Sequence, residues 1–230
     1  MRLDAVECSL ASWTWLLLIS GTLRHVHESR GNFPTNTPRW FTDTDEGTSE
    51  WYAEHFRELA AEGSDLEGEA RLADAVVAPG SRILDAGCGQ GRTAAALHHR
   101  GHHVTAVDID PVLLTAARTD NPGPNYIEAD LSNLNLSHEV GGGFDAAVSA
   151  GNVITFVAPG TEVEVLRCIR GLLRPDGPYL LGFHVDRYPL EAFDVAIEQA
   201  GFHLEQRFAT WDLRPWKSDS EFAVSILRST

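Results

Sequence analysis

The residues most able to do chemistry in this chain are three glycines at alternating positions, within the run Asp85-Ala86-Gly87-Cys88-Gly89-Gln90-Gly91. The run follows a short apolar stretch and precedes an alanine-rich one, which is the order of a buried strand, a turn and a helix. Glycine has no Cβ and accepts positive φ, so the backbone can approach a ligand whose polar groups meet the free N–H groups at the helix start. The pattern predicts a site for a nucleotide-like ligand.

Three carboxylates narrow the ligand. Asp85, Asp108 and Asp130 stand at or next to the ends of successive predicted strands, where ligands of open α/β sheets bind. Asp108 follows the first glycine by about 20 residues, the spacing of a carboxylate that accepts hydrogen bonds from ribose hydroxyls. A dinucleotide loop has glycine where this chain has Arg92, and the Asp85 carboxylate suits a cationic amine better than a pyrophosphate. We therefore expect a nucleoside that bears an amino acid and no phosphate, with S-adenosylmethionine as the leading candidate.

The elements that must position these residues alternate between strand and helix. Two helical patterns, residues 50–61 and a stretch from Ser64 with a Ser64/Glu67 capping box, precede the first strand. Strands are predicted at 81–86, 103–107, 126–129, 144–149, 179–184, 202–211 and 222–227, and later helices at 93–100, 112–118, 161–173 and 190–200. Asp110-Pro111 predicts an N-cap followed by a first-turn proline, and Thr161 with Glu164 fits a second capping box.

These patterns predict an α/β fold with a doubly wound, mainly parallel seven-stranded sheet, an antiparallel last strand, helices on both faces and an N-terminal helical cap. Residues 1–43 are expected to be an extension and linker, and 44–230 one domain whose first helices, 44–78, form the cap. The apolar stretch 10–23 is shorter than the roughly 20 residues of a membrane span. A loosely docked extension, a helix packed on the domain or a partner, and a targeting element all remain open for the extension, and the composition of residues 29–45 predicts a linker.

Composition limits the partners. The formal net charge of −15 and the sequence pI near 5.0 disfavour nucleic acid and anionic membranes as partners, and we expect neither. Three scattered cysteines indicate a reducing, cytoplasmic setting without a disulfide framework. The run 98–103, rich in histidine, fits a solvated helix end better than a metal site, and no metal is expected. The oligomeric state cannot be read from the sequence.

The ordered motifs resemble those of class I, Rossmann-like S-adenosylmethionine-dependent methyltransferases. The resemblance lies in residues 85–91, 104–108, 127–131, 144–149 and 173–177, in the family's order. It implies that Gly87, Gly89 and Gly91 contact the methionine part, Asp108 the ribose, Asp130 the adenine amine with Leu131 nearby, and Ala150 to Asn152 the surroundings of the sulfonium. Asp85, Cys88 and Ile109 complete the expected cofactor contacts, and S-adenosylhomocysteine is the expected product.

Each of these residues also has a plainer interpretation. Asp85 could brace the loop backbone, and Asp108 or Asp130 could cap the turn that follows it. Cys88 is expected to be a small filler within the loop and not a nucleophile.

The chemistry expected from the resemblance is in-line methyl transfer to a small molecule, which depends mainly on holding acceptor and methyl group at near-attack distance. His184 is the best-placed candidate general base. Asn152 stands where many amino-group and nucleic-acid methyltransferases carry an N/D-P-P-Y/F signature, but the proline and the aromatic residue of that signature are missing here, which argues against methylation of a base or an amide. Trp51, Tyr52, His55 and Trp211 are the candidate aromatic lid over the acceptor. Aminopropyl transfer and a non-catalytic module that binds the cofactor are the alternatives.

Overall fold

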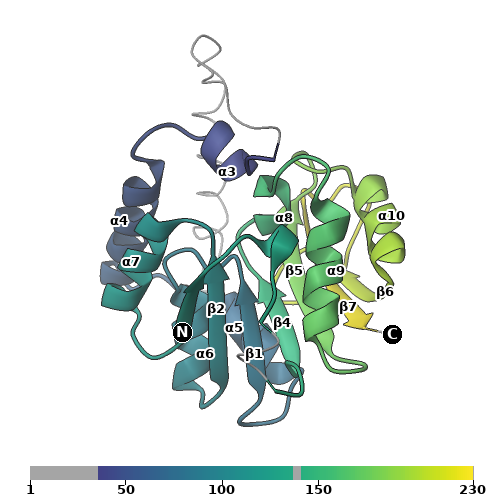
Figure 1. Ribbon diagram of the computed structural model, residues 1–230, viewed down its shortest axis with the longest axis horizontal. Coiled ribbons are helices and arrows are strands. Elements are labelled where there is room, and N and C mark those ends of the chain that lie inside the picture. Colours follow the sequence, from purple (N-terminus) through teal and green to yellow (C-terminus); the bar gives the residue numbers. More distant parts are fainter. Residues whose placement is uncertain (1–35, 137–140, 230) are drawn as a thin grey trace, which may run out of the picture.

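A single seven-stranded sheet organises the computed structural model, which describes residues 36–136 and 141–229 (Figure 1). The strands are β1 Arg82–Ala86, β2 His103–Asp108, β3 Asn125–Glu128, β4 Ala146–Ser149, β5 Pro178–His184, β6 Phe202–Phe208 and β7 Phe222–Ser229. Their order is β3-β2-β1-β4-β5-β7-β6, and β7 runs antiparallel between β5 and β6. The predicted fold class is confirmed. The alternatives for residues 1–35 lie outside the described part of the chain.

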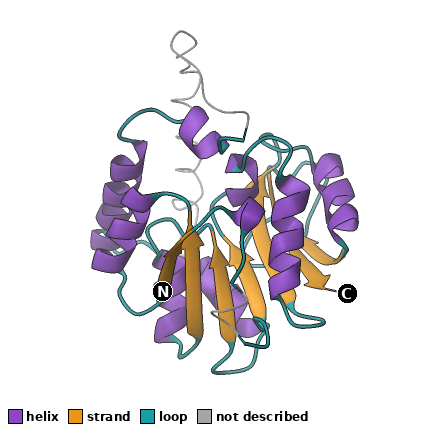
Figure 2. Ribbon diagram, viewed as in Figure 1, coloured by secondary structure: helices purple, strands orange, loops and turns teal. Residues whose placement is uncertain are grey.

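Helices cover both faces of the sheet (Figure 2). They are α3 Arg39–Thr42, α4 Thr48–Ala61, α5 Gly68–Ala75, α6 Arg92–His99, α7 Pro111–Asp120, α8 Val153–Phe156, α9 Glu162–Leu172 and α10 Leu190–Ala200, with a 3₁₀ turn η1 Leu131–Asn133. In the described ranges no helix has the length and apolar character needed to cross a bilayer.

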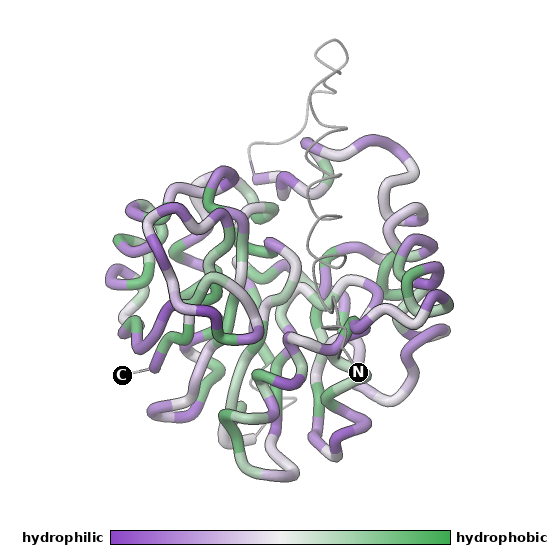
Figure 3. Tube along the Cα trace, turned by 180° about the vertical axis from the view of Figure 1, so that it is seen from behind, coloured by the Kyte–Doolittle hydropathy of each residue, from purple (hydrophilic) through white to green (hydrophobic). Residues whose placement is uncertain are grey.

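The core lies in two layers, one on each face of the sheet. Ile83 of β1 packs with residues of α5 and α6, whereas its neighbour Leu84 packs with residues of α9 and α10. Successive strand residues point to opposite faces, so a strand covered on both sides must be apolar throughout. Figure 3 shows this as green along the central strands. The carboxyl ends of β1, β2 and β4 thereby become the rigid edge on which the site is built.

Two predicted capping boxes are wrong. α5 begins at Gly68 and not at Ser64, because Asp65 accepts hydrogen bonds from the N–H of Glu67 (3.2 Å) and from Arg71 (2.6 and 2.8 Å), which hold this segment in a turn. At α9, the Thr161 hydroxyl donates to the carbonyl of Ala158 (2.7 Å) and does not cap the helix. Local polar competition of this kind is common for such short side chains.

The Asp110-Pro111 prediction is confirmed at the start of α7. The Asp110 carboxylate accepts hydrogen bonds from the N–H groups of Val112 (2.8 Å) and Leu113 (3.3 Å). In contrast, α3 lies inside the segment whose composition predicts a linker. A helix of four residues is too short to show a helical periodicity in the sequence. At its N-terminus, the Arg39 N–H donates to the carbonyl of Val157, which is far away in the sequence (3.4 Å).

Gly182 tests the packing between β5 and the outer strands. A Cβ at this position would lie 2.7 Å from the ring of Trp211 and 2.8 Å from that of Phe222, so Gly182→Ala overpacks the core. We expect it to lower the free energy of unfolding by about 1–3 kcal/mol in urea titrations. Gly171→Ala is the matched control: it meets no atom within 4 Å, lies in α9, and should raise stability by about 0.5–1 kcal/mol. Equal effects of the two substitutions would contradict this packing.

Candidate active site

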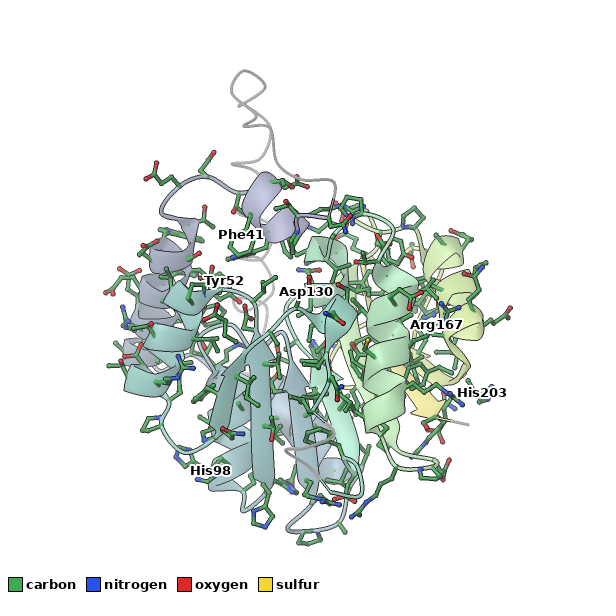
Figure 4. All side chains as sticks on the ribbon, in the orientation of Figure 1. Phe41, Tyr52, His98, Asp130, Arg167 and His203 are labelled. Carbon is green, nitrogen blue, oxygen red and sulfur yellow. The ribbon has the colours of Figure 1, made fainter. Side chains whose placement is uncertain are left out.

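A hollow of about 940 Å³, counting solvent at its open mouth, lies at the carboxyl ends of β1, β2 and β4. Most of the residues expected to bind the cofactor line it together with one expected lid residue: Asp85, Gly87, Cys88, Gly89, Asp108, Ile109, Asp130, Leu131, Ala150 and Tyr52. Figure 4 places Tyr52 and Asp130 at the same end of the sheet, and His98 at the opposite end. The topology has therefore brought together side chains that are far apart in the sequence.

The glycine loop is fastened to the end of β2. The N–H groups of Gly87 and Cys88 donate to the Val107 carbonyl (2.8 and 2.9 Å), and the N–H of Gly89 donates to the Asp108 carboxylate (2.7 Å). Gly87 has φ +82°, and a Cβ on it would lie 2.5 Å from Val153 at the start of α8. A larger residue would push the loop off α8, so the close approach requires glycine here.

Asp108 braces the loop, a role that the sequence interpretation considered only for Asp85. Its second oxygen accepts the N–H of Asp110 (2.9 Å), and burial is the main reason why the pKa of the carboxyl rises to about 6. A carboxylate has about four lone-pair positions, so two backbone bonds leave capacity for ribose hydroxyls. Asp108 is thus held in orientation while still able to bind ligand.

Asp85 has the opposite character. Its side chain is buried, with 1% exposed, and within the described chain neither carboxylate oxygen has a hydrogen-bond partner. Burial raises its pKa to about 7, and the positive charge of Arg92 opposes this rise. The backbone N–H of Ala94 in α6 opposes it weakly, without reaching hydrogen-bond geometry. An unpartnered buried carboxylate is costly, and it does not brace the loop. The arrangement favours the other interpretation of Asp85, a partner for a cationic amine.

Arg92 is a pocket residue that sequence reasoning treated only as a missing glycine. Its guanidinium pairs with Glu69 of α5 (2.8 Å for the Nη1 contact), donates to the Leu66 carbonyl (2.8 Å) and lies over the ring of Phe56, 5.3 Å from its centroid. It therefore fastens α4 and α5 to the loop and places a positive charge near Asp85. An arginine directly after the third glycine, with acidic residues upstream, was the available signal.

The far end of the hollow carries the residues expected near the adenine. Asp130 caps η1, accepting the N–H and the hydroxyl of Ser132 (both 2.8 Å) on the same oxygen, Oδ1. It also lines the hollow, as Ile109 and Leu131 do. The capping and ligand-binding interpretations of Asp130 are therefore compatible, because only one carboxylate oxygen is used by the cap.

Both expected catalytic residues lie outside the lining of the hollow. Asn152 has φ 66° at the start of α8, and its Oδ1 accepts the backbone N–H of His184 (2.7 Å), so it ties α8 to the end of β5. The His184 ring packs edge-on against Phe222, its Nε2 is buried without a partner in the described chain, and burial lowers its pKa. Asn152 therefore connects two elements, and the buried His184 ring does not line the hollow. Gly91, the last glycine of the loop, is likewise absent from the lining and lies against Tyr126.

Of the expected lid residues, Tyr52 alone lines the hollow. Trp51 is 47% exposed and stacks on His55 on the outer side of α4, and Trp211 is buried in the core against Gly182. The other aromatic residues of the hollow, Trp40 and Phe156, were not predicted from the sequence. Trp40 of α3 meets Tyr52 edge-on at 5.9 Å and Phe156 of α8 at 5.4 Å, measured between ring centroids. We call Trp40, Tyr52 and Phe156 the aromatic roof.

Two further side chains fit their plainer interpretations. Cys88 is buried, and burial raises the pKa of its thiol well above the ordinary value, which suits a filler and not a thiolate nucleophile. No group of three or more potential metal ligands occurs among the described residues. The expectation of a metal-free site remains a prediction.

The residues of the hollow fit S-adenosylmethionine on physical grounds. The buried carboxylate of Asp85, which has no partner in the described chain, would meet the ammonium of the methionine part. The glycine loop leaves space beside it, and Asp108 could accept ribose hydroxyls. The site holds no cluster of basic residues for a phosphate; Arg92 is its one positively charged lining residue in the described chain, and Glu69 already pairs with it.

Comparisons with known proteins agree with this geometry. Residues 83–177 match the family described as "Methyltransferase domain". The structure of a TehB-like SAM-dependent methyltransferase from Corynebacterium glutamicum superposes with a TM-score of 0.76 and 40% identity, covering 81% of this chain and 100% of that one.

Curated relatives match over shorter stretches. A ribosomal protein L11 methyltransferase of Symbiobacterium thermophilum is 37% identical over 48% of this chain and 34% of its own length. A ubiquinone biosynthesis O-methyltransferase of Xanthomonas campestris is 32% identical over 57% of this chain and 54% of its own. The chain thus spans between a third and about half of these curated relatives.

Asp85 gives a prediction about stability and pH. Its pKa of about 7 in the folded protein exceeds the ordinary 3.8, so the folded state binds more protons than the unfolded state between about pH 4 and pH 7. The contribution of Asp85 therefore lowers stability as pH rises through this window. Asp85→Asn should make the ligand-free protein about 1–3 kcal/mol more stable than wild type at pH 8, and the difference should shrink toward pH 4.

Urea unfolding at several pH values measures this difference. Asp219→Asn, at an exposed position, is the matched control and should leave the profile unchanged. A wild-type protein more stable than Asp85→Asn at pH 8 would show that the carboxylate is satisfied within the fold.

Proposed function

The chain belongs to the class I S-adenosylmethionine-dependent methyltransferases, and we propose that it methylates a small molecule held under the aromatic roof. The observation that carries this proposal is the enclosure of the cofactor residues by Trp40, Tyr52 and Phe156 in one hollow.

S-adenosylmethionine, when bound, supplies an already activated methyl group. The protein's residues then have to bind, orient and exclude water. Asp85 would hold the ammonium, Asp108 the ribose, and Ile109 and Leu131 the flat sides of the base. The backbone of Ala150 and Gly151 would lie beside the reacting centre, where the roof excludes water and aligns the acceptor. Such positioning can supply about 7–11 kcal/mol of the barrier.

Proton removal from the acceptor is not assigned to a side chain of the hollow. Burial raises the pKa of Tyr52 to about 12, so its hydroxyl is neutral at physiological pH. His184, the expected base, is not among the residues that line the hollow. An acceptor that carries its own nucleophile, such as a neutral amine, a thiolate or another easily ionised group, fits this lining best.

The named relatives do not fix the acceptor, because their names refer to a ribosomal protein and to ubiquinone biosynthesis. The aromatic roof favours a small-molecule acceptor over a protein, because Pro38, Val157 and the three aromatic rings form an apolar enclosure. The net charge of −15 gives no long-range attraction for nucleic acid. Cytoplasmic location remains a prediction.

Calorimetry with S-adenosylmethionine tests cofactor binding. Asp108→Asn should weaken binding by about 10- to 100-fold, because a charge-assisted hydrogen bond contributes roughly 1.5–3 kcal/mol. Asp219→Asn, exposed and away from the hollow, should bind as the wild type does.

Formation of S-adenosylhomocysteine with a panel of small acceptors then tests turnover. Turnover that requires a protein acceptor would contradict the small-molecule proposal. Cofactor binding without turnover on any acceptor would favour a non-catalytic binding module.

A further inference from the structure

Asp110 is a buried carboxylate with two separate sets of partners, one on each oxygen. Oδ1 accepts the N–H groups of Val112 (2.8 Å) and Leu113 (3.3 Å), which completes the N-cap of α7. Oδ2 accepts the indole N–H of Trp40 (2.7 Å) and the hydroxyl of Ser49. An N-cap needs one oxygen, so the second oxygen serves a different purpose.

The same residue touches the expected ribose carboxylate through its backbone. The N–H of Asp110 donates to Asp108 Oδ1 at 2.9 Å, while the N–H of Gly89 donates to Oδ2. A shift of Asp110 would therefore rotate Asp108 and release one of the two bonds that hold it. Asp110 thus connects the roof residue Trp40 with the residue that orients the ribose.

α3, which carries Trp40, crosses over the hollow and is held at both sides. On one side Trp40 bonds to Asp110 at the start of α7. On the other side Arg39 bonds through its N–H to the Val157 carbonyl (3.4 Å) and through its guanidinium to Glu162 of α9 (3.1 Å). Figure 1 shows α3 above the space between α4 with α7 and α8 with α9.

Core burial does not hold α3 in place, because none of its residues is fully buried. A segment with so little buried apolar area opens at low free-energy cost. Its position over the cofactor hollow is set by these few polar contacts and by the edge-on contacts of Trp40 with Tyr52 and Phe156.

We propose that Asp110 is a positioning residue, whose Oδ2 holds Trp40 so that the roof closes in register with the ribose-binding carboxylate Asp108. This inference rests on the proposed function, since it concerns how the same hollow retains its cofactor. Asp110 is not among the residues that line the hollow, and it acts through Trp40 and Asp108. Loosening the Trp40 contact should let the bound cofactor escape, although the residues that contact the cofactor are unchanged.

Asp110→Asn isolates this role. Asparagine is as good an N-cap as aspartate, but it has one acceptor oxygen; with that oxygen on the cap, its NH₂ group faces the indole N–H of Trp40. We expect S-adenosylmethionine to bind the full-length variant about tenfold more weakly, with little change in the urea midpoint. Trp40→Phe keeps an aromatic ring in the roof and removes the N–H, and should weaken binding similarly.

The double variant separates a shared link from two independent effects. If one hydrogen bond carries both losses, Asp110→Asn with Trp40→Phe should bind no more weakly than either single variant. Trp51→Phe is the matched control, because Trp51 lies on the outer side of α4. Cofactor binding should change the tryptophan emission of wild type and Trp51→Phe, and this change should be lost in Trp40→Phe.

The outcomes distinguish this inference from the proposed function. Failure of the wild type to bind the cofactor overturns the proposed function and this inference with it. Binding by the wild type with unchanged affinity of Asp110→Asn overturns the positioning role alone. Additive losses in the double variant, or a loss in Asp110→Asn without one in Trp40→Phe, also overturn it, because the effect would then run through the helix cap and not the roof.

Discussion

The buried carboxylate of Asp85 is the constraint on which the site depends. It lies at the end of β1, where burial removes it from water and the described chain offers it no hydrogen-bond partner. Desolvation raises its pKa to about 7, so the ligand-free protein carries an unfavourable charge or a retained proton there. A cationic ligand removes that cost. The free energy lost at this position would then be available as binding affinity for that ligand.

The remaining carboxylates do different work, set by their partners. Asp108 is held by two backbone N–H groups in an orientation from which it would bind the ribose, whereas Asp130 caps η1 with one oxygen and leaves the other for the hollow. Asp110 extends the same network to α3, so Asp108 and the aromatic roof share one set of hydrogen bonds. Among the described residues, the aromatic roof over the proposed acceptor side has no comparable polar network. It is an apolar enclosure, which agrees with a reaction that depends on alignment and on exclusion of water.

The sheet, its helices and the cofactor-facing residues of the loop could be predicted because they leave local signals. Buried strands are apolar throughout, glycine marks the loop, and a carboxylate follows each of the first strands. The roof could not be predicted in this way. Trp40 acts through contacts with α7 and α8, which only the folded chain brings near, and its own helix is four residues long. His184 and Asn152 have suitable chemistry and stand at strand ends, but the Asn152 amide oxygen is used by the backbone N–H of His184, and the buried His184 ring packs against Phe222.

The central claim is that Asp85 is a desolvated carboxylate that the ammonium of the cofactor completes. Calorimetric titration with S-adenosylmethionine near pH 6.5, in two buffers of different ionisation enthalpy, counts the protons released on binding. With pKa values of about 7 for Asp85 and about 6 for Asp108 in the ligand-free protein, binding should release about one proton per cofactor. In Asp85→Asn the release should fall to a small fraction of that. Binding with no proton release, or with the same release in wild type and Asp85→Asn, would contradict it.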